Sequence, residues 1–237
     1  MRYRSNIEAP DLAPYFRLLD PPMQHAGHDT PSDPVFDPLR VGYFTHDEAA
    51  ILWAIARRVG GLWIDMGARL GWTAAHLAVA GCSVIAIDQE YAHSDEFAGR
   101  AILNLRAALG KRFDVELVGC KTAEFTKPVW CTGAVIDADH DPPNPLNDTK
   151  IALRSMGPDC AIVFHDCLTG LAVRDGIRYL MDMGFQCRMY WTPNGVACCW
   201  RGLPGFVPPD HTPDPNIDFA SHRATMADFW EYLKRCA

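Results

Sequence analysis

The sequence predicts an α/β fold with a seven-stranded, mostly parallel sheet, helices on both faces of the sheet and a C-terminal antiparallel hairpin. Five short apolar segments alternate with segments of helical spacing, which is the pattern of parallel strands joined by crossover helices. These five segments are almost continuously apolar, as is typical of strands buried on both faces. Two more strand segments, 185–191 and 196–200, are joined by a Thr-Pro-Asn-Gly turn and are therefore expected to pair as a hairpin.

The predicted elements follow in order from Thr45, as in a Rossmann-like fold. Thr45 and Glu48 match a capping box, and the apolar run after them has helical spacing, so the first helix is expected to end near Val59, before two glycines. Ser94 is expected to cap a later helix, and Gly110 lies just past the end of that helix. In chain order, the predicted strands are 62–66, 83–88, 113–118, 133–139 and 160–166, and they alternate with helices at 72–80, 95–109, 145–156 and 171–183 and with a helical turn at 122–126.

The two ends of the chain do not follow this alternation of predicted strands and helices. Residues 1–44 hold seven prolines and few apolar residues, which predicts an irregular arm or lid, and residues 45–237 are expected to form the one domain. Residues 202–220 are a proline-rich loop, and residues 221–236 have the pattern of an amphipathic helix.

Composition excludes several classes of protein. Hydrophobic residues make up 49% of the 237 residues and charged residues 22%, which is ordinary for a soluble globular chain. The net charge of −7 argues against binding to nucleic acid, which needs a basic surface. The sequence has no run of 18 apolar residues, so no membrane span is expected. The N-terminus lacks the apolar segment of a signal peptide.

The nine cysteines favour a reducing compartment, and a cytoplasmic location is expected. Their number is odd, no C-x-x-C pair is present to form a zinc site, and several lie in apolar segments as small buried residues.

Acidic residues and glycines meet where the first two predicted strands end. Asp65 closes the first strand, Gly67 and Gly71 follow it, and Asp88 closes the second strand 23 residues after Asp65. Ligands of open α/β sheets lie beyond the carboxyl ends of the strands, and an acid about 20 residues past a glycine turn is the spacing that holds ribose hydroxyls. Arg69 occupies the place of the middle glycine of a dinucleotide turn, so a ribose ligand without a pyrophosphate fits better. The alternative is an ordinary turn in which the two acids cap helices.

A second group of polar residues follows the fourth and fifth predicted strands. Asp137, Asp139 and His140 end the fourth strand, and His165 and Asp166 end the fifth. Such a group needs a partner, and Mg²⁺ or Ca²⁺ would suit the carboxylates, whereas the mixed set would also suit Mn²⁺, Fe²⁺ or Zn²⁺. The alternative is a hydrogen-bonded pair of Asp139 and His140 with Asp166 capping the segment after it.

The first group lies in a segment that resembles a known motif. IDMGARLGWTAAHLA followed by VIAID resembles motif I and the acidic loop of class I S-adenosylmethionine (SAM) methyltransferases, in particular the small-molecule O-methyltransferases. This resemblance implies SAM as cofactor, with Asp65 and Gly67 by its methionine end and Asp88 on its ribose. GCKTAEF at 119–125 resembles the segment that touches adenine. The implied cofactor-binding residues are Asp65, Gly67, Ala68, Arg69, Gly71, Thr73, Asp88, Gln89, Cys120, Lys121, Thr122 and Asp137.

The second group lies in segments that resemble the same enzymes. VIDADHD, AIVFHD and WTPNGV are similar to segments of bacterial O-methyltransferases related to macrolide-sugar O-methyltransferases and cephalosporin-hydroxylase-like proteins, and the resemblance covers about 45–200. It implies Asp137 and Asp166 as ligands of Mg²⁺ or another divalent cation and His140 as general base, with Asp137 in the catalytic group. His165 stands where these relatives carry an acid, and it joins the implied metal set.

The implied function is SAM-dependent O-methyl transfer to the hydroxyl of a small molecule, with metal assistance left open. The alternatives are a metal-dependent oxygenase on the same fold, suggested by the hydroxylase-like relatives, and a SAM-binding protein without catalysis, which the departures at Arg69 and Lys121 allow. Residues 1–44 and 202–220 are candidates for shaping the acceptor pocket. A homo-oligomer is left open. The aromatic residues that would either line that pocket or pack inside the protein are Tyr15, Phe16, Phe36, Tyr43, Phe44 and Phe206.

Overall fold

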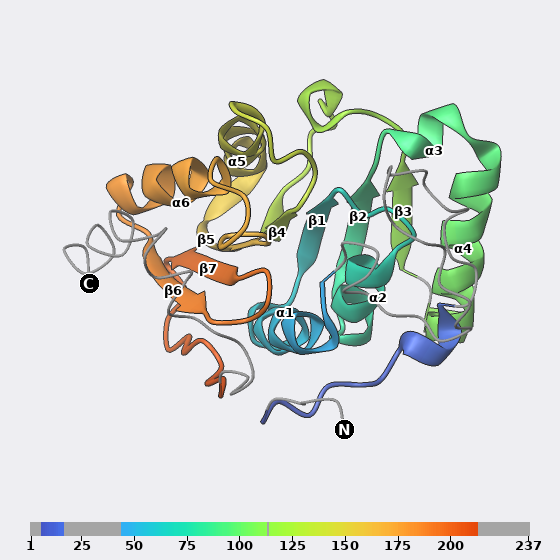
Figure 1. The fold of residues 1–237 in the computed structure, drawn as a ribbon, viewed down its shortest axis with the longest axis horizontal. Helices are drawn as coiled ribbons and strands as arrows, with labels where there is room; N and C mark the ends of the chain where they lie inside the picture. Colours follow the sequence, from blue (N-terminus) through green and yellow to red (C-terminus); the bar gives the residue numbers. More distant parts are fainter. Residues whose placement is uncertain (1–5, 17–43, 113, 213–237) are drawn as a thin grey trace.

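The structure, a computed structural model, describes residues 6–16, 44–112 and 114–212 (Figure 1). The predicted helix at 221–236 and most of the predicted arm at 1–44 lie outside the described residues. The chain forms one seven-stranded sheet in the order β3-β2-β1-β4-β5-β7-β6. The strands are β1 (Leu62–Met66), β2 (Ser83–Ile87), β3 (Val115–Val118), β4 (Cys131–Ile136), β5 (Met156–Phe164), β6 (Gln186–Tyr190) and β7 (Val196–Arg201).

Strands β1 to β5 are parallel, and β7 and β6 add an antiparallel pair at one edge. The strand order reverses between β1 and β4. β2 and β3 lie on one side of β1, whereas β4 and β5 lie on its other side. This is the switch point at which ligands of such sheets bind. The predicted fold class is therefore confirmed.

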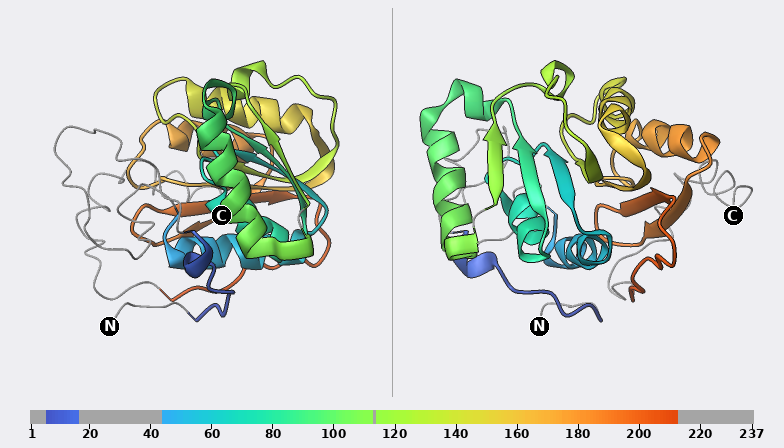
Figure 2. Two further views of the ribbon diagram at one scale, coloured as in Figure 1. Left: turned by 90° about the vertical axis from the view of Figure 1, so that its right-hand side faces the viewer. Right: turned by 180° about the vertical axis from the view of Figure 1, so that it is seen from behind.

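The helices cover both faces of the sheet, and Figure 2 (left) shows the sheet between α5 on one side and α1 on the other. Alternate strand residues face opposite sides, so that Trp63 and Val135 join the core under α1, α2 and α4, whereas Ile64 and Ile136 join the core under α5 and α6. The helices are α1 (His46–Val59), α2 (Trp72–Val79), α3 (Glu90–His93), α4 (Asp95–Leu109), α5 (Asn144–Arg154) and α6 (Val173–Asp182), with short 3₁₀ turns η1 (Ala13–Tyr15), η3 (Gly110–Arg112) and η4 (Thr122–Glu124).

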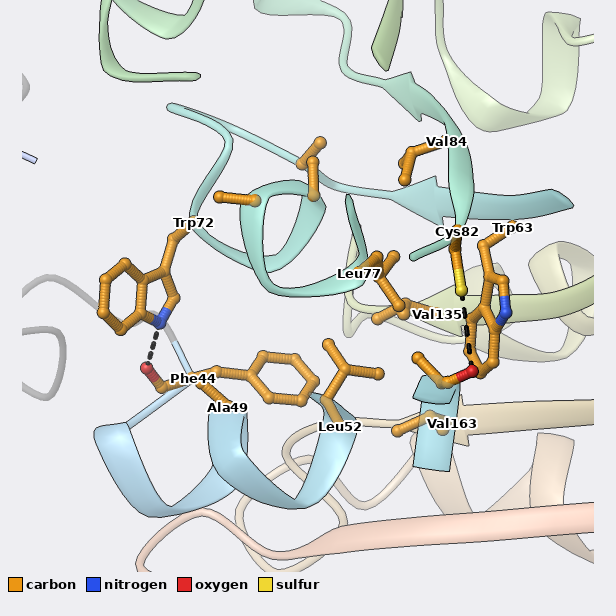
Figure 3. Packing of buried hydrophobic residues seen from close by; sticks show 14 of the residues in the cluster. Phe44, Ala49, Leu52, Trp63, Trp72, Leu77, Cys82, Val84, Val135 and Val163 are labelled. Carbon is orange, nitrogen blue, oxygen red and sulfur yellow. Dashed lines mark hydrogen bonds between the residues drawn. The ribbon is translucent and has the colours of Figure 1, made fainter. Parts of the chain in front are cut away.

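Buried apolar side chains pack closely in the core between α1, α2 and the sheet (Figure 3). Trp63 and Trp72 are fully buried, and the indole N–H of Trp72 donates to the backbone oxygen of Phe44 (2.9 Å). Gly133 of β4 makes room for Trp63, because a Cβ at Gly133 would lie 2.2 Å from the indole ring. A polar donor is thus satisfied inside the core, and the start of α1 is tied to the start of α2.

The first helix begins and ends where the sequence predicts. The Thr45 side chain accepts from the backbone of Glu48, and the Glu48 side chain accepts from the backbone of Thr45, which completes the capping box. Gly60 takes a positive φ of 68° just past the last turn.

Two strand boundaries differ from the prediction by three residues or more. β4 ends at Ile136 instead of 139, and a bend follows at Ala138, although the backbone N–H of Asp137 still donates to Met66 of β1. β5 begins at Met156 instead of 160, and its first residues include Pro158. A register shift between Cys131 and Gly133 accommodates these extra residues, since prolines are tolerated in strands at such irregularities.

The N-terminal segment that the structure describes packs onto the domain. Leu12 and Phe16 are buried, and the ring of Phe16 meets Trp72 edge-on at a centroid distance of 5.0 Å. Phe16 is therefore a packing residue. Whether residues 1–44 act as an arm or lid stays a prediction.

No helix within the described ranges is long and apolar enough to cross a membrane. Eight of the nine cysteines lie in these ranges, and all eight are free thiols.

Candidate functional site

The carboxyl ends of β1, β2, β4 and β5 come together at one edge of the sheet, since these strands are parallel neighbours. The arrowheads of β1, β2 and β3 point to this edge in the right panel of Figure 2. The turn from β1 to α2 and the loop after β2 form one half of the edge, which we call the cofactor edge. The loops after β4 and β5 form the other half, which we call the acceptor edge.

The turn at 67–71 packs directly against the acceptor edge. Gly67 has a φ of 88°, and a Cβ on it would lie 2.3 Å from the backbone oxygen of Asp137. The backbone of Asp137 and Ala138, just after β4, thus leaves no room for a side chain at Gly67. Gly71 also has a positive φ, 87°, at the N-terminus of α2. Arg69 takes the left-handed conformation that glycine favours, with a φ of 45°.

Asp65 is buried inside the cofactor edge. Its Oδ2 accepts from the hydroxyl of Thr73 (2.5 Å), whereas its Oδ1 has no hydrogen-bond partner among the described residues. Burial raises the pKa of Asp65 to about 7, and the charges of Asp137 and Asp88 act in the same direction against the hydrogen bond from Thr73. An unsatisfied buried oxygen is costly, so this atom is suited to accept from a donor group of a ligand.

Asp88 ties the loop after β2 to the glycine turn. Its Oδ2 accepts from the backbone N–H of Arg69 and its Oδ1 from the backbone N–H of Glu90, both at 2.9 Å. The contact with Glu90, the first residue of α3, is the cap-like role of the alternative interpretation. Each oxygen keeps a further lone pair, so the carboxylate can still accept from hydroxyl groups. The hydroxyl of Tyr91 donates to the backbone oxygen of Arg69 and supports the same turn.

The remaining residues of the predicted cofactor set follow the carboxyl ends of β1, β2 and β3. Ala68 is buried, with its backbone N–H donating to Ile87, and Gln89 is exposed at the start of α3. After β3, Cys120 is half-buried, the Lys121 side chain is exposed, and the hydroxyl of Thr122 donates to Asp148.

Asp148 of α5 was not anticipated as a site residue. It is buried, its Oδ2 has no hydrogen-bond partner within the described part of the chain, and burial raises its pKa to about 6. The sequence around Asp148 has the pattern of an ordinary amphipathic helix, and nothing in it marks Asp148 as a site residue.

The acceptor edge brings Asp137, His140 and Asp166 together. One ligand atom of each lies within 4.8 Å of the others, and His140 Nε2 is 3.5 Å from Asp137 Oδ1 and 3.2 Å from Asp166 Oδ2. The hydrogen bond to Asp137 raises the pKa of His140 above its ordinary value, although burial opposes it. Two carboxylates and an imidazole that remain partly exposed are a donor set that fits a divalent cation.

Asp139 stands apart from this group. Its oxygens accept from the backbone of Asp141 (2.9 Å) and from the side chain of Asn144 (2.7 Å), so it orders its own loop and forms no pair with His140. Asp166 has a positive φ of 55°, and its Oδ1 accepts from the hydroxyl of Thr169 (2.7 Å). This bond comes from a side-chain hydroxyl and not from a backbone N–H, so the capping role considered for Asp166 stays a prediction.

His165 lies beneath the acceptor edge, fully buried. Its Nδ1 is 3.0 Å from Asp137 Oδ1 and 3.2 Å from Asp166 Oδ2, and its Nε2 is 3.1 Å from Glu48 Oε2. Burial alone would lower the pKa of His165, but the charges of Asp137 and Glu48 outweigh it and hold the pKa well above the ordinary value. Both nitrogens of His165 thus face carboxylates in this arrangement, and its implied role as a metal ligand stays a prediction.

Glu48 and Asn194 complete the buried network. Glu48 Oε1 accepts from the backbone N–H of Asn194 (3.0 Å), and Oε2 accepts from its side-chain amide (3.3 Å) and from Thr45 (2.7 Å). The ring of Phe44 stacks on His165 at a centroid distance of 4.1 Å, so Phe44 packs over the network instead of lining a pocket. The capping box accounted for Glu48 locally, and no local signal points to partners more than 100 residues away.

Solved structures of three methyltransferases have a similar fold. TomG, an O-methyltransferase of Streptomyces achromogenes solved with SAM, is 19% identical over 65% of this chain and 79% of its own, with a TM-score of 0.51. A SAM-dependent O-methyltransferase of Thermotoga maritima is 16% identical over 69% of this chain and 68% of its own, with a TM-score of 0.52. A precorrin-6y C5,15-methyltransferase of Geobacter metallireducens is 12% identical over 67% of this chain and 89% of its own, with a TM-score of 0.51.

No family model and no curated protein matches the chain in sequence. At these identities the likeness to the three structures establishes the fold, which is the Rossmann-like fold of methyltransferases.

Proposed function

We propose that the protein is a SAM-dependent O-methyltransferase that acts on the hydroxyl of a small molecule. The observation that carries the proposal is the turn at 67–71, which contacts both halves of the site. Its Arg69 bonds to Asp88 on the cofactor edge, and its Gly67 lies against Asp137 on the acceptor edge. A ligand held at this turn is therefore next to a group of side chains suited to activate an acceptor. The similar structures of two O-methyltransferases, one of them solved with SAM, support the same function.

On the cofactor edge, each acidic residue has a chemical role toward SAM. The partnerless Oδ1 of Asp65 would accept from the ammonium group of the methionine part, which explains why an acid is buried there. Asp88 would accept from the ribose hydroxyls, and Cys120, Lys121 and Thr122 on the loop after β3 would contact the adenine.

On the acceptor edge, His140 would remove the proton of the acceptor hydroxyl. SAM, when bound, would supply the methyl group to that hydroxyl oxygen and would leave as S-adenosylhomocysteine. Asp137 and Asp166 would stabilise the imidazolium of His140, because both carboxylates lie close to its Nε2. The protein would thus contribute alignment and proton removal.

A divalent cation such as Mg²⁺ would be held by Asp137 and Asp166 beside His140, and it would lower the pKa of the acceptor hydroxyl when bound. His165 already supplies positive charge to both carboxylates, so we propose the cation as an aid and not as a requirement of the fold. The eight free thiols support our proposal of a reducing, cytoplasmic location.

The test is formation of S-adenosylhomocysteine from SAM with a panel of small hydroxyl compounds, measured with and without EDTA and with and without oxygen. We expect acceptor-dependent turnover under nitrogen. A strict need for oxygen would instead identify an oxygenase, and SAM binding without turnover on any acceptor would identify a binding protein. Full activity in EDTA would remove the cation from the proposal.

A further inference from the structure

Glu48 is a fully buried carboxylate that lies outside the acceptor edge but is connected to it. It comes from the first turn of α1, and its two oxygens accept hydrogen bonds from Thr45, His165 and Asn194. Burial alone would raise the pKa of Glu48, but the charge and hydrogen bond of His165 outweigh it and lower the pKa to about 2. A helix cap on a protein surface needs only the bond to Thr45, so the capping box does not explain why this side chain is buried and charged.

We propose that Glu48 is a positioning residue for methyl transfer, which acts through His165 on Asp137 and Asp166; this inference rests on the function proposed above. Glu48 holds Nε2, and the opposite nitrogen of the same ring faces the two carboxylates of the acceptor edge. Phe44 stacks on the ring and leaves it little freedom to rotate. The orientation of both carboxylates is thereby linked to a residue that contacts neither of them.

The backbone beside the acceptor edge depends on the same network. The backbone N–H groups of Cys167 and Leu168 donate to Gly195 and Asn194, so the turn that binds Glu48 also holds the chain just after Asp166. Asp166 has a positive φ, a conformation that persists in a non-glycine residue only where its surroundings enforce it. Glu48 is thus connected to Asp166 both through the ring of His165 and through the 192–195 turn.

The test compares Glu48→Gln with the control Thr45→Ala. Glu48→Gln keeps the size of the side chain but replaces one acceptor oxygen by an NH₂ group. This group donates hydrogen bonds and cannot accept one from the donor that faces it. Thr45→Ala breaks the capping bond to the Glu48 backbone and leaves the Glu48 carboxylate in place. We expect Glu48→Gln to lower kcat about 10- to 100-fold, in the range found when the partners of functional groups are removed, while SAM affinity and acceptor KM change little. Thr45→Ala should lower Tm with kcat unchanged.

A double-mutant cycle separates positioning from a general loss of stability. In a His165→Gln background the connection through the imidazole ring is already broken and only the 192–195 turn remains, so Glu48→Gln should lower kcat less than it does in the wild-type background. Equal loss of kcat in both backgrounds, or loss of kcat in Thr45→Ala that matches Glu48→Gln, would overturn the proposal.

The ring signals of His140 and His165 in ¹⁵N NMR spectra give a readout that does not need turnover. If the wild-type protein transfers no methyl group, the proposed function fails. A shift of both ring signals in Glu48→Gln, with none in Thr45→Ala, would still support the positioning role. Unchanged signals would overturn it.

Discussion

The two edges of the site are built over different distances along the chain. On the cofactor edge, Thr73 bonds to Asp65 eight residues away and Arg69 to Asp88 nineteen residues away. On the acceptor edge, His165 bonds to Asp137 across 28 residues and to Glu48 across 117, and Asn194 bonds to Glu48 across 146. The cofactor edge therefore forms within one β-α-β unit. The acceptor edge is complete only when β5 and the hairpin of β6 and β7 have joined the sheet. The two edges should consequently respond to mutation in different ways.

The largest effect on activity is expected from the acceptor edge alone. His140→Ala should lower kcat by about 10²–10⁴-fold, because it removes the base that takes the acceptor proton. SAM affinity should stay close to that of the wild type, since the charged partners of His140 are Asp137 and Asp166 on the acceptor edge. Steady-state kinetics and calorimetric titration with SAM check the two halves of this prediction. A parallel loss of SAM affinity would mean that the two edges are not separable.

Asp88→Ala should act on the cofactor edge. Loss of its ribose contacts should cost about 1–3 kcal/mol of binding, which weakens SAM affinity about 5- to 150-fold. It should also lower the free energy of unfolding, because Arg69 and Glu90 lose the acceptor of their backbone N–H groups. Calorimetry and denaturant unfolding measure the two effects. Unchanged affinity in the folded variant would show that the ribose lies elsewhere.

Asp65 gives the cofactor edge a pH dependence. Its pKa of about 7 in the free protein means that it carries a proton below neutral pH, and a cationic ligand would displace this proton. SAM affinity should therefore rise with pH up to about 7, by as much as about tenfold per pH unit, and level off above. The stability of the free protein should run the other way. Because the folded pKa is raised above the ordinary value, the contribution of Asp65 is full at acidic pH and is lost as pH rises through about 7.

Titration calorimetry between pH 5.5 and 8.5 checks this dependence, and Asp65→Asn is the matched control. The amide cannot ionise, so its SAM affinity should be weak and flat across this range. A pH-independent affinity in the wild type would contradict the role given to Asp65.

The smallest effect is expected from Arg69→Gly. A left-handed conformation costs an L-residue about 1–2 kcal/mol, and the added flexibility of glycine offsets about 0.5–1 kcal/mol of the relief. The net gain in stability should thus be about 1 kcal/mol or less, with SAM affinity unchanged. A clear loss of affinity would instead mean that the Arg69 side chain binds the cofactor.

The fold and the cofactor edge could be predicted from the sequence because their signals are local. Apolar segments that alternate with segments of helical spacing, glycines just past helix ends and the capping box at Thr45 each act within a few residues. The two boundaries that differ most, at the end of β4 and the start of β5, lie where the chain leaves or enters the sheet irregularly, and residues such as Pro158 gave no strand signal there. The spacing of Asp65, the glycine turn and Asp88 lies within one unit and was visible for the same reason.

The acceptor edge could be predicted only in part. Asp137, His140 and Asp166 were identified, since ends of neighbouring strands meet. The charge and orientation of His165 were not, because they depend on Glu48 and Asn194. Each of these two residues has a sufficient local explanation, as a helix cap and as a turn residue, and only the tertiary structure reveals their second partner.

The capping box of α1 has a consequence for how the chain folds. The carboxylate of Glu48 can cap its own helix at once, but its hydrogen bonds to His165 and Asn194 wait for β5 and for the hairpin of β6 and β7. Contacts between residues so far apart form late, since the entropy of closing the intervening loop must be overcome first. The first helix of the domain should therefore gain its full protection from hydrogen exchange only after the last hairpin has docked. A chain still emerging from the ribosome without residues 192–195 would hold α1 by its capping box and its apolar face, without the hydrogen bonds from Asn194 to Glu48.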